Sequence, residues 1–592
     1  MARTRLVVIG NGMVGHHFLG QLAEHESVGE FEVTVIGEEQ HIAYDRVHLS
    51  EYFQGSGADD LALSTQQQYA DWGFDLRLNA RVTAIDREAR TLTLDDGSQL
   101  NWDRLVLATG SYPFVPPIEG NDRPDCLVYR TLEDLDAIQE AASRSNTGVV
   151  VGGGLLGLEA ANALRELDLD TAVVEFAPRP MPVQVDDEGG ALLKEKIEDL
   201  GVQVLTGRAT QRIEDGHHAR HQMVFQDEQL LETDLIVFSA GIRPRDELAR
   251  EAGLTMGERG GVVIDDHCRT SDDDILAIGE VALWNDSIFG LVSPGYQMAK
   301  AALDTLTGGE RCFQGADMST KLKLLGVDVG AVGDAHGNQN PGARFFRYTD
   351  QLNQEYRKLV VSADGKQLLG AMLVGDNSYY DTLLQYCTNG LELPEQPESL
   401  ILPASEGGSP TLGVDALPDS AGICSCHNVS KGDIVQCVHD GHTSVGAVKE
   451  ATKAGTGCGG CAPQLKDIVD HEMAALGMEV DNTLCEHFPY SRQELEHIIR
   501  VNDIHDFRTL IREHGRGLGC DICKPAVASI LASTWNDYVL NPEHVGLQDT
   551  NDTFLANMQK DGTFSVVPRV AGGEITPDKL ITLGEVAKDY GL

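Results

Sequence analysis

The chain carries one supersecondary pattern twice, and this repeat restricts its fold more than any other feature of the sequence. Each copy has a short apolar run, a Gly-x-Gly-x-x-Gly turn, a helix-like segment, a second apolar run and an acidic residue. The first copy occupies residues 6–38 and the second occupies residues 148–175. The glycines and the acid are Gly10, Gly12, Gly15 and Glu38 in the first copy, and Gly152, Gly154, Gly157 and Glu175 in the second.

The three glycines of such a unit have different tasks. The first permits a tight turn, the second lets backbone amides approach a pyrophosphate, and the third lets the helix pack closely on the strand. The helix N-terminus adds partial positive charge, and the acid accepts hydrogen bonds from a ribose diol. The two copies therefore predict two dinucleotide sites. Glycines that merely end strands would not explain the two acids.

Two further apolar runs end in small or acidic residues, one at Thr109 and Gly110 and the other at Gly279 and Glu280. With the two glycine turns, they make the chain resemble the flavoproteins that have two dinucleotide domains. The resemblance implies an α/β fold with two Rossmann-like domains, FAD on the first turn and NADH or NADPH on the second. The FAD-binding residues that it implies are Gly10, Gly12, Gly15, Glu38, Arg46, Thr109, Gly110, Gly279 and Glu280. The nicotinamide dinucleotide would use Gly152, Gly154, Gly157 and Glu175.

The coenzyme and the electron acceptor are less sharply indicated. Glu175 favours NADH, because a carboxylate at the ribose repels a 2′-phosphate, whereas the nearby Arg179 leaves NADPH open. No cysteine precedes Cys126, although disulfide reductases of this fold carry a redox cysteine pair early in the FAD domain. Electrons must therefore leave the flavin for a small diffusible acceptor or for a cluster within the protein.

The C-terminal part of the chain contains a second repeat, built from close pairs of metal-ligating residues. The first unit has Cys424, Cys426, Cys458 and Cys461, and the second has Cys485, His487, Cys520 and Cys523. Each unit also has a Ser-x-x-acid helix start, at Ser430 and Ser491. Four thiolates hold a [2Fe–2S] cluster or a zinc ion, and spacing alone leaves both open. Coupling to a flavin favours iron–sulfur in the first unit, because zinc carries no electrons.

The first unit also resembles the [2Fe–2S] module of bacterioferritin-associated ferredoxins. For the second unit two interpretations stay open, namely a metal site with three cysteines and one histidine, or a degenerate copy kept for its helical packing. The remaining cysteines are expected to be ordinary buried thiols. These are Cys126, Cys268, Cys312, Cys387 and Cys437.

The order of these parts over essentially the whole chain resembles the large subunit of bacterial assimilatory NAD(P)H nitrite reductases. We expect an FAD-binding domain at 1–115 and 241–310, an inserted NAD(P)H-binding domain at 116–240, an α+β interface domain at 315–395, a linker at 396–420, a helical [2Fe–2S] module at 421–475, a second such module at 482–540, and at 541–592 the start of a ferredoxin-like nitrite/sulfite reductase half-domain. No cysteine follows Cys523. Sirohaem and a [4Fe–4S] centre are therefore expected only in a missing C-terminal domain, and we expect the chain to be truncated.

Charge and hydropathy exclude several classes of partner. The chain has 46 Lys and Arg against 92 Asp and Glu, a net charge of −46, which disfavours binding to nucleic acid or to anionic lipid. No apolar stretch approaches the length of a membrane span and no signal peptide is recognisable. We therefore expect a cytoplasmic protein. A homo-oligomer is a separate expectation.

The resemblance implies a specific electron path. NAD(P)H would reduce FAD, FAD would reduce the [2Fe–2S] cluster, and a sirohaem domain or small subunit would use the electrons to reduce nitrite to ammonium. The alternative is a stand-alone NADH:acceptor flavin reductase that serves a separate nitrate- or nitrite-reducing partner. No residue is assigned a catalytic role, and this chain alone is not expected to turn over nitrite.

Overall fold

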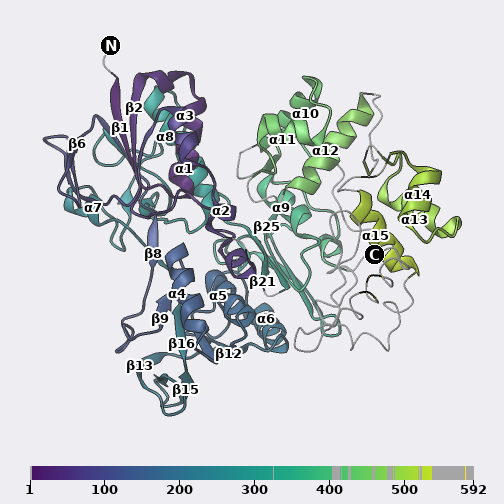
Figure 1. Cartoon of the computed structure of the whole chain (residues 1–592), viewed down its shortest axis with the longest axis horizontal. Helices are drawn as coiled ribbons and strands as arrows, with labels where there is room; N and C mark the ends of the chain where they lie inside the picture. Colours follow the sequence, from purple (N-terminus) through teal and green to yellow (C-terminus); the bar gives the residue numbers. More distant parts are fainter. Residues whose placement is uncertain are drawn as a thin grey trace. The chain divides into compact units, whose positions relative to one another are not determined.

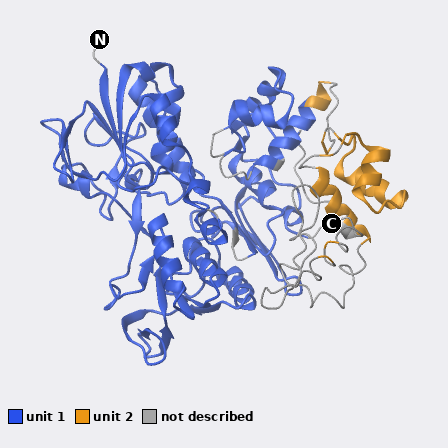
Figure 2. Ribbon diagram, viewed as in Figure 1, with its two compact units in different colours: residues 1–472 blue, residues 473–592 orange. Residues whose placement is uncertain are grey.

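The computed structural model describes residues 3–55, 57–324, 326–402, 414, 417–424, 429–456, 461–476, 484–485, 487–517, 519, 523–535, 581 and 584. The chain divides into two compact units, Met1–Glu472 and Met473–Leu592 (Figure 2). The first unit contains both nucleotide-binding folds, the interface sheet and the first cysteine module. The second unit contains the second cysteine module.

The first glycine turn belongs to a parallel five-stranded sheet with the order β19-β7-β1-β2-β3. Its strands are β1 (Thr4–Ile9), β2 (Phe31–Ile36), β3 (Asp75–Arg77), β7 (Arg104–Leu107) and β19 (Ile275–Ala277). The last strand pairs in parallel with β7 although the second nucleotide fold lies between them in sequence. Helices α1 (Met13–Glu24) and α8 (Val292–Thr307) pack together beside this sheet (Figure 1).

The second glycine turn belongs to another parallel sheet, with the order β12-β11-β10-β16-β9. Its strands are β9 (Cys126–Val128), β10 (Thr147–Val151), β11 (Asp170–Glu175), β12 (Gln203–Thr206) and β16 (Leu235–Phe238). Its helices are α4 (Leu132–Ala142), α5 (Leu155–Glu166) and α6 (Asp187–Asp199). The central strands are buried on both faces, as parallel strands with helical crossovers usually are. The predicted α/β class with two Rossmann-like sheets is confirmed.

Smaller elements surround these two sheets. Three-stranded antiparallel sheets are formed by β4 (Val82–Asp86), β5 (Thr91–Leu94) and β6 (Gln99–Asn101), and by β13 (Thr210–Asp215), β14 (His221–Phe225) and β15 (Leu230–Thr233). Two short pairs are β8 (Ser111–Pro113) with β17 (Ile242–Pro244) and β18 (Val262–Val263) with β20 (Ala282–Leu283). Short helices are α2 (Ala58–Leu61), α3 (Gln66–Trp72), α7 (Glu247–Glu251), η1 (Glu26–Glu30), η2 (Leu49–Gln54), η3 (Gly279–Val281) and η4 (Pro397–Leu400). The β8–β17 pair lies where the chain enters and leaves the second nucleotide fold.

An antiparallel sheet follows, in the region predicted to be the interface domain. Its order is β21-β22-β25-β24-β23, with β21 (Thr320–Leu324), β22 (Val327–Gly333), β23 (Arg344–Asp350), β24 (Glu355–Val361) and β25 (Leu368–Val374). Strand β25 is buried on both faces. Met372 and Val374 pack in one core with α6, whereas Ala371 and Leu373 pack in another core with α9 (Tyr380–Thr388).

The two cysteine modules have the same succession of helices. The first contains β26 (Gly422–Cys424), β27 (Val429–Ser430), α10 (Lys431–His439), α11 (Val445–Thr452) and α12 (Ala462–Ala475). The second contains α13 (Arg492–Val501), α14 (Phe507–His514) and α15 (Cys523–Trp535). Both predicted helix starts are confirmed, because Ser430 with Asp433 and Ser491 with Glu494 form reciprocal capping boxes.

One expectation about the remaining cysteines is wrong. Cys312 is exposed, while Cys126 and Cys387 are half-buried and only Cys268 and Cys437 are buried. Cys312 lies between α8 and β21, outside regular structure, and its Sγ is 3.7 Å from Nε2 of His267.

In the described part of the chain, no helix combines the length and apolar character that a bilayer span requires.

A buried ion pair fastens the interface sheet to the second nucleotide fold. Asp186 caps α6 by accepting a hydrogen bond from the Gly189 amide, and its Oδ2 accepts from Nζ of Lys358 at 3.0 Å and from the Tyr356 hydroxyl at 2.9 Å. The Lys358 side chain is 4% exposed. Burial alone would raise the pKa of Asp186, but these hydrogen bonds hold that pKa below its ordinary value.

Replacing Lys358 by Met is expected to lower the thermal midpoint of unfolding by about 5 °C, because the Asp186 carboxylate would lose its buried cation. Differential scanning calorimetry would measure the shift. Lys366 provides a matched control, since its ion pair with Glu392 is exposed, and Lys366→Met should move the midpoint by no more than about 1 °C. Equal shifts for the two variants would contradict this assignment.

Candidate functional site

The two glycine turns have matching geometry. Gly10 and Gly152 have φ angles of +114° and +121°, which side chains rarely adopt. A Cβ atom on Gly15 would lie 2.3 Å from the Gly10 carbonyl oxygen, and one on Gly157 would lie 1.9 Å from the Gly152 carbonyl oxygen. In both folds the first glycine therefore makes the turn, and the third allows the helix to pack on it.

The middle glycine of each turn faces open space. Gly12 and Gly154 are the N-cap residues of α1 and α5, and neither helix start has a side-chain cap. A Cβ atom at either position would meet no atom of the described chain within 4 Å. Each helix start thus offers backbone N–H groups and a positive dipole end beside an open space, which fits the pyrophosphate of a dinucleotide.

The acid of the second copy is held against its glycine turn. Glu175 accepts hydrogen bonds from the backbone amides of Gly153 at 2.5 Å and Ala177 at 2.6 Å. Arg179 is engaged elsewhere, because it donates to the Val185 carbonyl at 2.8 Å and to Asp187 at 2.5 Å. The Glu175 carboxylate is thus fixed beside the second glycine turn, while Arg179 is paired with Asp187.

The predicted FAD residues meet around an arginine that sequence reasoning missed. Arg245 donates from Nη1 to Glu38 at 2.9 Å and from its amide to the Gly110 carbonyl at 2.9 Å, and its own carbonyl accepts from Thr109 Oγ1 at 2.7 Å. The structure thus brings Glu38, Thr109 and Gly110 together. No local motif marks Arg245, since its contact with Glu38 spans 207 residues.

Glu280 and Arg46 belong to a neighbouring polar group. Glu280 accepts from the Ser111 hydroxyl at 2.6 Å and forms an ion pair with Arg130. Arg46 donates to the Arg130 carbonyl at 3.0 Å and pairs with Glu39. The predicted residues Arg46 and Glu280 are therefore joined through Arg130, which sequence reasoning also missed. Gly279, beside Glu280, has a φ of +78° and approaches Val14 of α1.

The α5 helix also carries an unusual carboxyl group. Glu159, two residues after Gly157, is half-buried near Tyr129 and His48, and its desolvation there raises its pKa to about 7. A group that changes protonation near neutral pH is a common feature of functional sites. It follows the glycine turn directly, so the motif contained it, but sequence analysis gave it no role.

The cluster thiols of the first module are only partly described. Cys424 is 2% exposed at the end of β26, and Cys461 immediately precedes α12. Cys426 and Cys458 lie outside the described residues. The assignment of all four thiols to one [2Fe–2S] cluster therefore stays a prediction.

A buried amide holds this module on the interface domain. Nε2 of Gln385, on α9, donates to the Gly422 carbonyl at 3.2 Å and to Oε1 of Gln464 at 3.1 Å. The Gly422 amide donates in turn to Asn389 at 3.2 Å. Gln385 is 2% exposed. These bonds attach two elements of the module to one helix of the interface domain. The elements are β26, which ends at Cys424, and α12, which follows Cys461.

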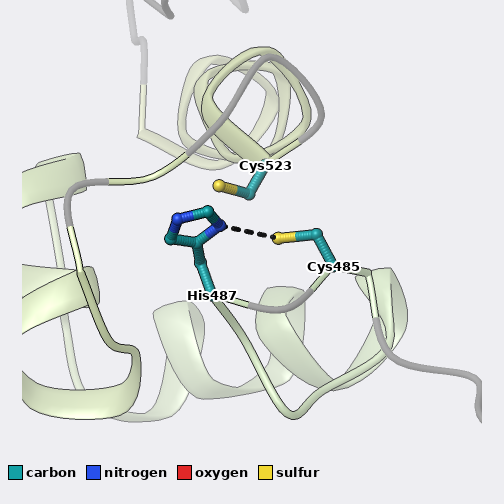
Figure 3. A group of neighbouring side chains, drawn as sticks. All are labelled: Cys485, His487 and Cys523. Carbon is teal, nitrogen blue, oxygen red and sulfur yellow. Dashed lines mark hydrogen bonds between the residues drawn. The ribbon is translucent and has the colours of Figure 1, made fainter.

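In the second module three of the four predicted ligands come together (Figure 3). The ligand atoms of Cys485, His487 and Cys523 all lie within 4.8 Å of one another. Cys520 lies outside the described residues.

Comparison with known proteins agrees with this arrangement. Residues 4–305 match the family described as pyridine nucleotide-disulphide oxidoreductase, residues 319–391 match the rubredoxin NAD+ reductase C-terminal domain, and residues 422–471 match the BFD-like [2Fe-2S] binding domain. Among curated proteins, the nitrite reductase [NAD(P)H] large subunit of Klebsiella oxytoca is 56% identical, and the nitrite reductase (NADH) large subunit of Escherichia coli is 54% identical. Both alignments cover 100% of this chain.

The chain belongs to the family of NAD(P)H nitrite reductase large subunits. It spans 62% of the length of the Klebsiella relative and 70% of the length of the Escherichia coli relative. Among solved structures, the putidaredoxin reductase–putidaredoxin complex is similar, with a TM-score of 0.59 and 25% identity over 68% of this chain and 96% of that one. Membership confirms an FAD-dependent NAD(P)H oxidoreductase with a [2Fe–2S] cluster. The matched [2Fe-2S] region ends before the second cysteine module.

Substitutions at the open glycines should separate the two nucleotide sites. Gly154→Val is expected to leave bound FAD unchanged and to raise the KM for NADH at least about tenfold, because the side chain would occupy the pyrophosphate position. Gly12→Val should instead reduce the FAD retained per chain. Absorbance spectra and steady-state kinetics would measure both effects. Gly29→Val is the control, because its Cβ also meets open space, on the exposed helix η1 away from both turns. Loss of FAD in Gly154→Val would contradict the assignment.

Glu159 should make stability depend on pH. Because the folded protein holds this proton more tightly than the unfolded chain, the contribution of Glu159 to stability falls as pH rises from about 4.5 to about 7. Glu159→Gln is therefore expected to stabilise the protein by about 2 kcal/mol at pH 8 and by little at pH 5. Thermal unfolding at both pH values would test this, with Glu166→Gln, at the exposed end of the same helix, as control for the lost charge. The same gain at both pH values would contradict the buried-proton explanation.

Proposed function

We propose that this chain is the electron-input part of a nitrite reductase. It oxidises NADH at the second glycine turn and delivers the electrons through the first cysteine module toward the sirohaem-dependent reduction of nitrite to ammonium. FAD would be held by the first glycine turn with Glu38, Arg46, Thr109, Gly110, Gly279 and Glu280. Cys424, Cys426, Cys458 and Cys461 would hold the [2Fe–2S] cluster. Bound FAD accepts two electrons together and releases them singly, and the cluster accepts one at a time.

The observation that carries this proposal is the attachment of the cluster module to the flavoprotein fold. Both glycine turns and the described thiols Cys424 and Cys461 belong to one compact unit. Gln385 and Asn389 bond the backbone of β26 directly. A buried amide with several directed hydrogen bonds has few alternative arrangements, so it holds the module in one position on the interface domain. A fixed position keeps the distance between the two bound groups constant, which favours repeated electron transfer between them.

The contacts of Glu175 and Arg179 support NADH as the coenzyme. Glu175 is oriented by two backbone amides, and a carboxylate there would repel the 2′-phosphate of NADPH. Arg179, the residue that would neutralise such a phosphate, is committed to Asp187 and Val185. NADPH binding would therefore have to break an existing ion pair.

The remaining expectations about assembly belong to the same proposal. A sirohaem domain or a small subunit would accept the electrons, and the protein would be a cytoplasmic homo-oligomer. The boundaries given above for the domains stay predictions, and nearly all of 541–592, predicted to begin a ferredoxin-like half-domain, lies outside the described residues.

An anaerobic NADH titration tests the electron path. We expect NADH to bleach the flavin absorbance and to generate a low-temperature EPR signal of a reduced [2Fe–2S] cluster. Cys461→Ser should keep the bleaching and lose at least about 90% of the signal, because a thiolate ligand is removed. Cys437→Ser is the matched control, since Cys437 is a buried thiol of the same module outside the ligand set. Bleaching without an EPR signal in the unaltered protein would overturn the path and indicate a diffusible acceptor.

A further inference from the structure

The second cysteine module contains a compact set of metal-ligating atoms. Cys485 and His487 lie on the turn before α13, and Cys523 is the first residue of α15. Cys485 Sγ is 3.8 Å from Nδ1 of His487, and the thiol of Cys523 extends toward the same imidazole (Figure 3). The three ligand atoms lie within 4.8 Å of one another. Residues 38 positions apart in sequence thus converge on one point.

The turn that carries Cys485 and His487 is firmly built. The Phe488 amide donates to the Cys485 carbonyl at 3.1 Å, and the Leu484 amide donates to the Tyr490 carbonyl at 2.7 Å. The Phe488 side chain is fully buried in the core of the module. Because the turn is closed and anchored, the side chains of Cys485 and His487 are both directed toward the start of α15.

Arg516 and Gly517 lie against the histidine. The Arg516 amide donates to the His487 carbonyl at 2.9 Å. Gly517 has a φ of +71°, and a Cβ atom there would lie 3.1 Å from Cδ2 of the imidazole. A side chain at 517 would therefore press on the ring. The Arg516 hydrogen bond fixes the backbone of His487, and the glycine at 517 leaves room for its imidazole.

The separations match the ligand shell of one ion. Zinc–sulfur and zinc–nitrogen bonds of about 2.3 and 2.0 Å in a tetrahedron place ligand atoms about 3.5 to 3.8 Å apart. The Sγ–Nδ1 distance of 3.8 Å agrees with this, and 4.8 Å needs only a small side-chain rotation. A [2Fe–2S] cluster distributes its ligands over two irons, so ligands on opposite irons are held further apart.

We propose that Cys485, His487 and Cys523 bind a single zinc ion that ties the turn before α13 to the start of α15. This site is structural and carries no electrons, in contrast to the first module. Thiolate and imidazole ligands grouped around one point are typical of structural zinc sites. Cys523 is fully buried in the core of the module with Phe488 and Val527, so this ligand is shielded from water.

The small hydrophobic core of the second module is a reason for it to bind a metal ion. Its described core is a cluster of nine buried residues from three helices, the turn before them and the loop between the first two, namely Phe488, Leu495, Ile499, Ile504, Leu510, Ile511, Cys523, Val527 and Ile530. Domains of this size usually need a disulfide or a metal to be stable, because they bury little surface. Zinc binding would supply that stability, since a structural site contributes its binding free energy to folding.

Metal analysis of the purified full chain tests the zinc site. We expect about one zinc per chain in addition to the iron of the first module. Cys485→Ser should release the zinc and leave the iron content and the EPR signal unchanged. Cys437→Ser, which alters a buried thiol outside both ligand sets, should retain both metals.

Cobalt substitution shows directly whether His487 is a ligand. Protein grown with Co2+ in place of zinc should show the visible absorption bands of tetrahedral cobalt with thiolate ligands. His487→Cys should keep the metal and shift these bands, because a thiolate would replace the imidazole; a histidine outside the shell would leave them unchanged. Three results would overturn the proposal. They are an unchanged cobalt spectrum in His487→Cys, an iron content that falls by half in Cys485→Ser, and a Cys485→Ser variant that loses no metal.

Discussion

The structure depends on the absence of side-chain atoms where a helix meets a strand. At Gly15 and Gly157 a Cβ atom would lie within 2.3 Å of a backbone carbonyl oxygen. This close packing places the N-termini of α1 and α5 beside the ends of β1 and β10, with amides directed at open space. Of the two acids that follow the neighbouring strands, Glu175 is bonded to the second turn and Glu38 to Arg245. Two nucleotide sites follow from two places where only glycine can stand.

Local signals in the sequence predicted much of this. The glycine turns, their acids and the capping boxes at Ser430 and Ser491 depend on residues close together in the chain, and the structure has all of them. The position of Arg245 among the predicted FAD residues was not predictable, because its partner Glu38 lies 207 residues away in the sequence. The role of Gln385 was not predictable either, because its partner in β26 is brought to it only by the fold. Burial of Cys312 was wrongly expected, since thiol burial depends on tertiary packing.

The two cysteine modules show the same limit in another form. Their shared pattern predicted a matching helix start in each module, at Ser430 and Ser491, and both are present. The spacing could not decide how the ligands of the second module group together. That depends on the closed turn at Phe488 and on the loop around Gly517, whose contacts with His487 are tertiary. Similar local sequences are therefore compatible with different metals in the two modules.

Strand β25 belongs to two hydrophobic cores at once. Its alternate residues face α6 of the second nucleotide fold and α9 beneath the cysteine module. A substitution on one face shifts the backbone that carries the other face, so neither core can adjust alone. Removing this sheet would expose both cores together. The second nucleotide fold and the interface sheet are thus separate in sequence only, and cutting the chain between them would leave the α6 face of β25 without its cover.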